Sequence, residues 1–290
     1  MNGGQSVTTM TAELAPAQDV TYERSLVSQF ASDVRVLTKR SIARIRREPE
    51  TLADVTIMPV IFILMFAYVF GGAILLPGHG SYHEYLIGGM LGMGLAQTAP
   101  GVAVALVTDM STGLMDRFRS LPMSRWAVLV ARSIAELLTQ LIGAAIVVCV
   151  GLAIGWRVHT GPVDVIEALA LSLLFGYAFT WAGVLLGMVL RSPEAAQATG
   201  FIVFLPLTFV SSAFVPTQGM PGWLQPVADW NPMSALAAAS RHLFGNPNPA
   251  ASVHSWPMQH PELAVVGWSV LMLAVFAPLA VRLFRRKVLG

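Results

Sequence analysis

The sequence predicts an all-α integral membrane protein with six transmembrane helices, an N-terminal amphipathic interfacial helix and a short cytoplasmic coupling helix. The first indication is composition: 55% of the 290 residues are hydrophobic and only 12% are charged, about half of the roughly 25% that soluble chains carry. Six apolar windows are also long enough to cross a bilayer. Most of the basic residues lie on one side of the membrane that these windows define. This composition disfavours a soluble enzyme, a disordered chain and a nucleic-acid-binding protein.

The N-terminal region precedes the first apolar window and divides into two parts. Residues 1–20 are polar and lack the pattern of a secretory signal peptide, so we expect a disordered tail on the cytoplasmic side. Residues 21–50 show apolar residues at helical spacing with basic residues on the other faces, which predicts an interfacial helix that ends at Pro49. This helix is either a lipid-surface anchor or also a docking element for a partner. Phe30 belongs to its apolar stripe, and its basic residues include Arg40, Arg44 and Arg47.

Residues 51–290 form the predicted six-span domain, because a span needs about 20 apolar residues. The third window is long enough to tilt or to extend beyond the bilayer, and the fifth is short. We expect Pro206 to interrupt the fifth span, since proline removes a helix hydrogen bond. The spans run over residues 55–76, 85–107, 127–156, 166–190, 199–215 and 263–284.

The basic residues orient this domain in the membrane. Sixteen of the 18 lie before span one, between spans two and three and at the start of span three, after span four, or at the C-terminus. The opposite side keeps only Arg157 and Arg241. Loops rich in lysine and arginine stay in the cytoplasm, so both termini are predicted to be cytoplasmic.

The connection between spans two and three contains a second amphipathic segment. Gly113 permits a turn, an apolar stripe follows at helical spacing, and Pro122 ends the segment. Asp116, Arg117 and Arg119 supply polar contacts. A short helix of this kind at the cytoplasmic face is suited to act as a lever for an attached soluble motor.

The connection between spans five and six is long and rich in proline and tryptophan. Asn231 followed by Pro232 is typical of a helix start, which predicts a short helix over Met233–Phe244 that dips into the outer leaflet. We predict no metal ligands here, because the spacing of the histidines matches no zinc signature. The aromatic and histidine residues of this connection are Trp223, Trp230, Trp256, His242, His254 and His260.

Motifs for chemistry within the chain are weak. No phosphate-binding loop or hydrolase motif occurs, so no catalytic residue is assigned. Glu136 lies one helical turn from Arg132, which favours an intrahelical ion pair over a proton relay. Cys149 lies in an apolar run and is expected to be a packed thiol. Three glycine pairs at helix-packing spacing, Gly88/Gly92, Gly151/Gly155 and Gly183/Gly187, indicate close helix contacts.

Several segments in this order resemble one known family. Arg-Arg-Glu-Pro49 precedes span one, Gly-Leu-Met-Asp-Arg-Phe-Arg-Ser-Leu-Pro122 follows span two, and Pro-Gly-Trp-Leu-Gln-Pro-Val-Ala-Asp-Trp-Asn-Pro232 precedes span six. Together they resemble type-2 ATP-binding-cassette (ABC) exporter permeases, and within them the daunorubicin/doxorubicin-resistance group. The resemblance covers nearly the whole chain, from about residue 30 to residue 287.

The resemblance implies a permease subunit in a bacterial cytoplasmic membrane that exports a hydrophobic or amphiphilic drug or lipid by alternating access. Two separate ATPase subunits would bind ATP and Mg²⁺, a second permease chain would complete a homo- or heterodimer, and this chain would bind no cofactor and no nucleic acid. The ATPase would dock on the interfacial helix and on a coupling helix of Leu114, Met115, Asp116, Arg117, Phe118, Arg119, Ser120 and Leu121.

The resemblance also implies that spans two and five line the substrate path. These positions carry no fixed charge, so selection for cationic drugs is unsupported. The path residues are Met90, Gln97, Thr98, Phe204, Phe209, Ser211, Ser212 and Phe214.

Three other functions stay open on the sequence. A polysaccharide or lipid-linked exporter of the same family would share the architecture. An ion-coupled secondary transporter would need no ATPase and would depend on Glu136. A membrane-embedded enzyme acting on lipid would need a polar catalytic cluster at one membrane face.

Overall fold

The computed structural model describes residues 49–72, 74, 76, 81–111 and 125–289, and within these ranges it contains helices and no β-strand. The expected N-terminal tail, the interfacial helix up to residue 48 and the coupling helix therefore lie outside the described residues. The all-helical class is confirmed for the part of the chain that is described.

Each of the six predicted spans coincides with one helix or with two consecutive helices. Four stretches among the described residues are long and apolar enough to cross a membrane, namely 82–111, 133–153, 162–189 and 261–284. The chain is thus a multi-pass membrane protein. The helices are α2 (Pro49–Leu64) with the π-helix η1 (Met65–Phe70), α3 (Tyr82–Ala96), α4 (Thr98–Ser111), α6 (Arg125–Ala153), α7 (Pro162–Val189), α8 (Pro193–Phe209) and α12 (Pro261–Leu289).

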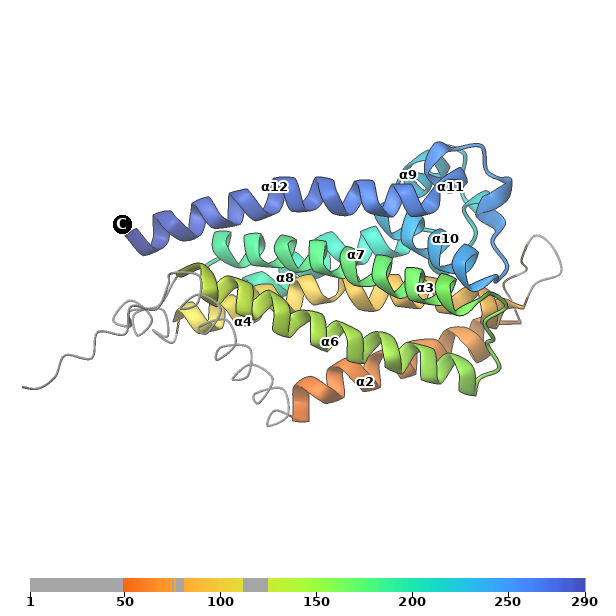
Figure 1. Cartoon of the computed structure of the whole chain (residues 1–290), viewed down its shortest axis with the longest axis horizontal. Helices are drawn as coiled ribbons and strands as arrows, with labels where there is room; N and C mark the ends of the chain where they lie inside the picture. The colour runs from red at the N-terminus through yellow and green to blue at the C-terminus, as the bar shows by residue number, and fades with distance from the viewer. Residues whose placement is uncertain (1–48, 73, 75, 77–80, 112–124, 290) are drawn as a thin grey trace, which may run out of the picture.

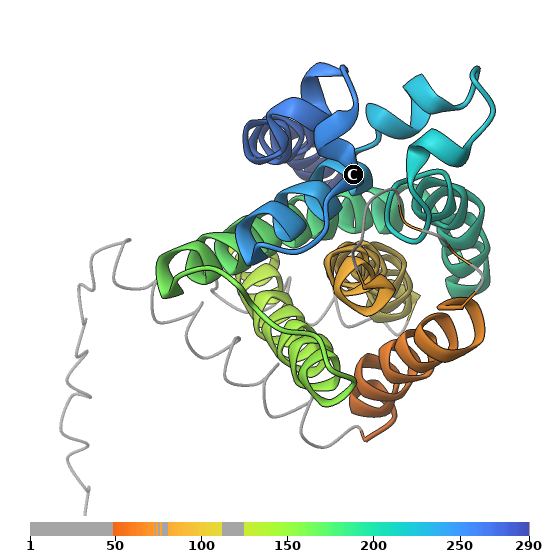
Figure 2. The ribbon, with the colours of Figure 1, turned by 90° about the vertical axis from the view of Figure 1, so that its right-hand side faces the viewer.

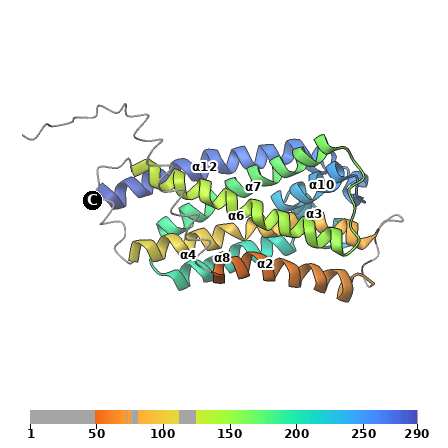
Figure 3. The same cartoon turned by 60° about the horizontal axis from the view of Figure 1, so that its bottom comes forward.

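The long helices run alongside one another, and the central position belongs to α3 and α4 (Figure 2). Around them lie α2, α6, α7 and α8, with α4 packed against α7 and α8, and α12 packed against α7. The short helices between α8 and α12 gather at one end of the bundle, and the C-terminus lies at the other end (Figures 1 and 3). They are η2 (Thr217–Gly219), α9 (Gln225–Asp229), α10 (Pro232–Phe244), η3 (Pro249–Ser252) and α11 (Trp256–Gln259).

Span two is not one continuous helix, which the sequence reasoning missed. It divides at Gln97 into α3 and α4. Pro100 explains the break, because proline has no N–H to donate to the carbonyl of Ala96 and its ring crowds that carbonyl. At the break the Thr98 hydroxyl donates to the Leu95 carbonyl at 2.7 Å, which replaces part of the lost helix bonding.

The expected interruption of span five at Pro206 is wrong, since α8 continues through this residue to Phe209. Pro206 and Ile202, the residue four positions earlier, both lie on the exposed side of α8. Because both residues are exposed, the proline ring is accommodated without displacing a buried neighbour. The irregular backbone begins at Val210 instead.

Two of the three predicted glycine pairs lie at helix contacts. A Cβ on Gly183 would stand 2.3 Å from the carbonyl oxygen of Ala99, and one on Gly187 would stand 3.0 Å from that of Ala103. These glycines therefore let α7 approach the backbone of α4. Gly88 and Gly92 face α10 in the same way, whereas Gly155 ends its helix region with a φ of +103°.

The predicted short helix of the connection between spans five and six is confirmed as α10. The Asn231 side chain caps it by accepting from the Met233 N–H at 2.8 Å, and Pro232 occupies the first turn. Gly245 ends it in the left-handed conformation, with a φ of +68°, which glycine adopts without steric cost. The three tryptophans of this connection, Trp223, Trp230 and Trp256, are all exposed.

Candidate functional site

Three of the predicted path residues belong to two apolar clusters of buried residues. Met90 and Phe214 lie in the cluster that includes Phe244 of α10, and the Phe214 ring stacks on Phe66 with 4.3 Å between the ring centroids. Phe204 lies in the second cluster, with 5.7 Å between its ring centroid and that of Phe179. Phe209 contacts Phe214 of the first cluster, at 5.5 Å between ring centroids, and leaves 48% of its own surface exposed.

The polar path residues differ in their exposure. Gln97 is exposed at the α3–α4 break and Thr98 is half-buried, while Ser211 and Ser212 are buried. The Ser211 hydroxyl donates to the Thr208 carbonyl at 2.5 Å. Gly94 and Gly101, on either side of the break, have open space where a Cβ would stand.

A buried glutamine joins three helices next to this break. Gln140 of α6 is 3% exposed, and its Nε2 donates to the Thr180 hydroxyl at 2.9 Å and to the Thr98 hydroxyl at 3.4 Å. The Thr180 hydroxyl in turn donates to the Gly176 carbonyl at 3.1 Å. Gln140 thus ties the α3–α4 junction to α6 and α7.

Replacing Gln140 with leucine is expected to destabilise the permease by about 0.5–1.5 kcal/mol, the range of polar side-chain contacts between membrane helices. The loss is small because both threonine hydroxyls keep their backbone acceptors. Unfolding of the purified chain in detergent measures it, with the exposed Gln197→Leu as the matched control. Equal stability of the two variants would contradict a role for this network.

The irregular segment 210–214, which follows α8, is held by side chains from α3 and α10. Asn231 Nδ2 donates to the carbonyls of Leu207 at 2.6 Å and Val210 at 2.5 Å. The Tyr85 hydroxyl donates to the Ser212 carbonyl at 2.6 Å, and the Tyr82 hydroxyl to the Phe214 carbonyl at 3.1 Å. We call segment 210–214 with these donors the carbonyl cradle.

Arg241 of α10 is the charged member of the carbonyl cradle and is fully buried. Its Nη2 donates to the carbonyls of Ser212 at 2.8 Å and Ala213 at 3.0 Å, and its Nε donates to the Tyr85 carbonyl at 2.8 Å. The guanidinium carbon lies 3.5 Å from the centroid of the Tyr85 ring, a cation–π contact.

The electrostatics of Arg241 follow from this burial. Burial lowers the pKa of the guanidinium from its usual value, and electrostatic interaction with Tyr85 and Tyr82 opposes that shift. Arginine nevertheless keeps its proton in proteins. A positive charge therefore lies buried at the end of the bundle that holds the short helices (Figure 1), where the sequence showed only an isolated basic residue.

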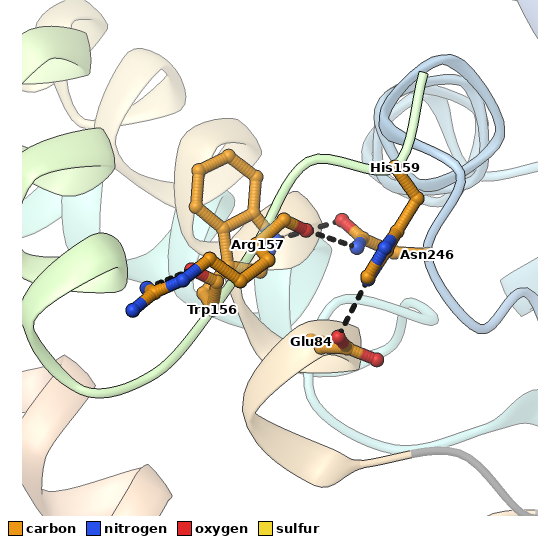
Figure 4. A network of polar contacts seen from close by, with 5 residues as sticks. All are labelled: Glu84, Trp156, Arg157, His159 and Asn246. Atoms are coloured by element: carbon orange, nitrogen blue, oxygen red, sulfur yellow. Dashed lines mark hydrogen bonds and ion pairs between the residues drawn. The ribbon is translucent and has the colours of Figure 1, made fainter.

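A second polar network joins the α6–α7 loop to the same region (Figure 4). Trp156 Nε1 donates to Asn246 Oδ1 at 2.7 Å, and Asn246 Nδ2 donates to the Arg157 carbonyl at 2.9 Å. His159 pairs with Glu84 at the start of α3 at 2.8 Å. The loop thus fastens the end of α10 to the start of α3.

The remaining candidates are placed as follows. Glu136 is half-buried on α6 and has an interaction partner, while the side chain of Arg132 lies outside the described residues. The expectation of a packed Cys149 is wrong, because this thiol is exposed on α6. An apolar run alone does not distinguish burial in protein from exposure on a membrane-facing side.

Comparison with known proteins decides the family. A family model described as ABC-2 type transporter matches residues 32–244, which is most of the chain. The chain belongs to the ABC-2 type transporter family. It is similar to the daunorubicin resistance ABC transporter permease protein DrrB1 of Streptomyces coeruleorubidus, with 34% identity over 86% of this chain and 84% of that protein.

Other relatives support the same assignment for this ABC-2 permease. The probable doxorubicin resistance ABC transporter permease protein DrrC of Mycobacterium tuberculosis is 25% identical over 95% of this chain and 96% of its own length. The putative transport permease ycf38 of Cyanophora paradoxa is 23% identical over 89% of each chain. The family is one of transport permeases and not of catalytic enzymes.

Proposed function

We propose that this ABC-2 permease is the membrane subunit of an ATP-driven exporter that moves a hydrophobic or amphiphilic drug or lipid out across the bacterial cytoplasmic membrane. The observation that carries the proposal is the similarity to drug-resistance permeases over 86% and 95% of the chain. The aromatic and small polar character of the predicted path, from Phe204 to Phe214, suits an amphiphilic substrate.

The complex comprises two copies of a separate ATPase subunit and a second permease chain, as a homo- or heterodimer. ATP and Mg²⁺ bind to the ATPase and not to this chain. Both termini lie in the cytoplasm and six spans cross the membrane, an orientation supported by the helix order: Arg191 follows α7 and Arg286 lies near the end of α12, at the bundle end away from α10 (Figure 1).

Transport proceeds by alternating access between the two permease chains. Closure of the ATPase dimer on ATP pushes the coupling helix at residues 114–121, while the interfacial helix at residues 21–50 holds the ATPase to the membrane surface. The permease halves then rock, and the substrate leaves along spans two and five.

Co-purification with the ATPase subunit tests this function. The permease is co-expressed with a candidate ABC ATPase subunit, purified and reconstituted in liposomes, and ATP hydrolysis is measured with and without daunorubicin. We expect one stable complex whose hydrolysis rises severalfold with the drug. A permease that purifies without an ATPase and transports in its absence would refute the proposal.

Replacing Glu136 with glutamine separates this function from ion-coupled transport. We expect ATP-driven transport to stay within about twofold of the wild-type rate, because no proton relay passes through this carboxylate. Drug uptake into inverted vesicles measures it. Complete loss of transport, with normal insertion of the variant, would favour the ion-coupled carrier.

A further inference from the structure

The carbonyl cradle satisfies backbone groups that have no helical partner. Because α8 ends at Phe209, the carbonyls of segment 210–214 and of the last turn of α8 need other donors. Unpaired backbone groups are costly near a bilayer. Asn231, Arg241, Tyr82 and Tyr85 supply donors for five of these carbonyls, those of Leu207, Val210, Ser212, Ala213 and Phe214. The outer end of span five is thus attached to α3 and α10.

The packing around segment 210–214 is equally close. A Cβ on Gly89 would stand 1.9 Å from the carbonyl oxygen of Ala213, and one on Gly88 would stand 2.8 Å from Cγ of Arg241. The Ser212 N–H also donates to the Ser234 hydroxyl of α10 at 2.8 Å. Segment 210–214 therefore contacts both helices through backbone as well as side chains.

An arginine at position 241 is less favourable for the folding stability of the chain than an apolar side chain would be. The guanidinium is fully buried, and its Nη1 has no hydrogen-bond partner among the described residues. A buried charge is often less stable than an apolar side chain of similar volume. The planar guanidinium is, however, the group that can stack on Tyr85 while it reaches three carbonyls. The unfavourable burial of this charge therefore indicates that Arg241 is needed for the geometry of these contacts.

We propose that Arg241 is a positioning residue for transport, which joins α3, segment 210–214 and α10 into one unit that moves as a whole during the transport cycle. The inference rests on the proposed function, because Ser211, Ser212 and Phe214 of this segment belong to the predicted path. Arg241 keeps these residues at a constant position relative to Met90 of α3 while the permease halves move.

Cross-linking tests the unit without reference to any substrate. Ser81 and Val215 flank the Tyr82–Phe214 hydrogen bond and are both exposed. The pair Ser81→Cys and Val215→Cys, in a Cys149→Ala background and in complex with the ATPase, is treated with a short thiol-specific cross-linker. The reaction is run without nucleotide and after trapping with ATP and vanadate.

We expect the same cross-linking yield in both states of the wild-type complex, and a yield reduced about threefold in the trapped state with Arg241→Gln. Arg157→Gln is the matched control, because Arg157 is an exposed arginine of the same outer region whose Nη1 contacts only carbonyls of its own loop region. A wild-type yield that changes severalfold between the states, or an Arg241→Gln yield equal to wild type, would overturn the proposal.

Transport kinetics distinguish positioning from a purely structural role. Arg241→Lys keeps the charge but lacks the planar donor group, so we expect the maximal rate of daunorubicin uptake into inverted vesicles to fall about tenfold, with KM and drug-free ATP hydrolysis within about twofold. Wild-type rates in this variant would overturn the proposal. If the wild-type complex itself does not transport daunorubicin, the substrate assignment fails, while cross-linking still decides the unit.

Discussion

Replacing Gly89 with alanine is expected to reduce the amount of folded permease severalfold. The added Cβ would stand 1.9 Å from the Ala213 carbonyl oxygen and 2.5 Å from the carbonyl carbon. Both atoms are backbone, so no side-chain rotation relieves the contact. Segment 210–214 must move away from α3, and the bonds of Arg241 and Tyr85 to this segment must lengthen.

The expected cost is about 3–5 kcal/mol. Overpacking contributes about 1–3 kcal/mol, and the weakened bonds to the charged Arg241 together add about 1.5–3 kcal/mol, the range for one hydrogen bond to a charged group. Because proteins unfold at a cost of only about 5–15 kcal/mol, such a loss lowers the folded fraction. The amount of monodisperse protein in detergent and its thermal unfolding midpoint measure the effect.

Gly94 provides the matched control on the same helix. No atom lies within 4 Å of the position that its Cβ would occupy, and alanine favours helix over glycine by about 1 kcal/mol. Gly94→Ala should therefore be neutral or slightly stabilising in the isolated chain. Equal behaviour of the two variants would contradict the close approach of Ala213 to α3.

Gly89 also illustrates what sequence reasoning could and could not predict. The spacing of Gly88 and Gly92 indicated a helix contact, and both face α10. Among the glycines of this helix, Gly89 nevertheless makes the closest approach, against a segment more than a hundred residues later in the chain. The four-residue spacing of glycines indicates that one face of the helix carries small residues. It does not indicate which distant backbone segment approaches the neighbouring face.

The spans were predictable because hydrocarbon imposes a length and an apolar composition on each of them. The breaks within them were not, since both Pro100 and Pro206 lie in apolar windows and only one ends a helix. Packing decides the difference: the described structure stabilises the break at Gln97 through Thr98 and Gln140. Arg241 was noted only for its side of the membrane, because a lone arginine does not reveal which distant carbonyls it will bind.

Replacing Asp116, Arg117 and Arg119 together with alanine is expected to uncouple transport from ATP hydrolysis. In the proposed mechanism these side chains contact the ATPase, and desolvated charge pairs at subunit contacts typically cost about 2–5 kcal/mol when one partner is removed. Daunorubicin uptake by reconstituted vesicles should fall at least about tenfold. ATP hydrolysis by the complex should persist, because the catalytic residues belong to the ATPase subunit.

The triple substitution removes the proposed contacts with the ATPase without weakening the helix that carries them. Alanine favours helix, and the apolar stripe of Leu114, Met115, Phe118 and Leu121 is left unchanged. Arg191→Ala is the control, because it removes an exposed basic residue between α7 and α8, which is predicted to lie on the same membrane side. A triple variant that transports at the wild-type rate would refute the coupling assignment. A triple variant that no longer co-purifies with the ATPase would instead show that these charges supply affinity for the ATPase subunit. The movement of the ATPase would then be transmitted through the apolar stripe of the same segment.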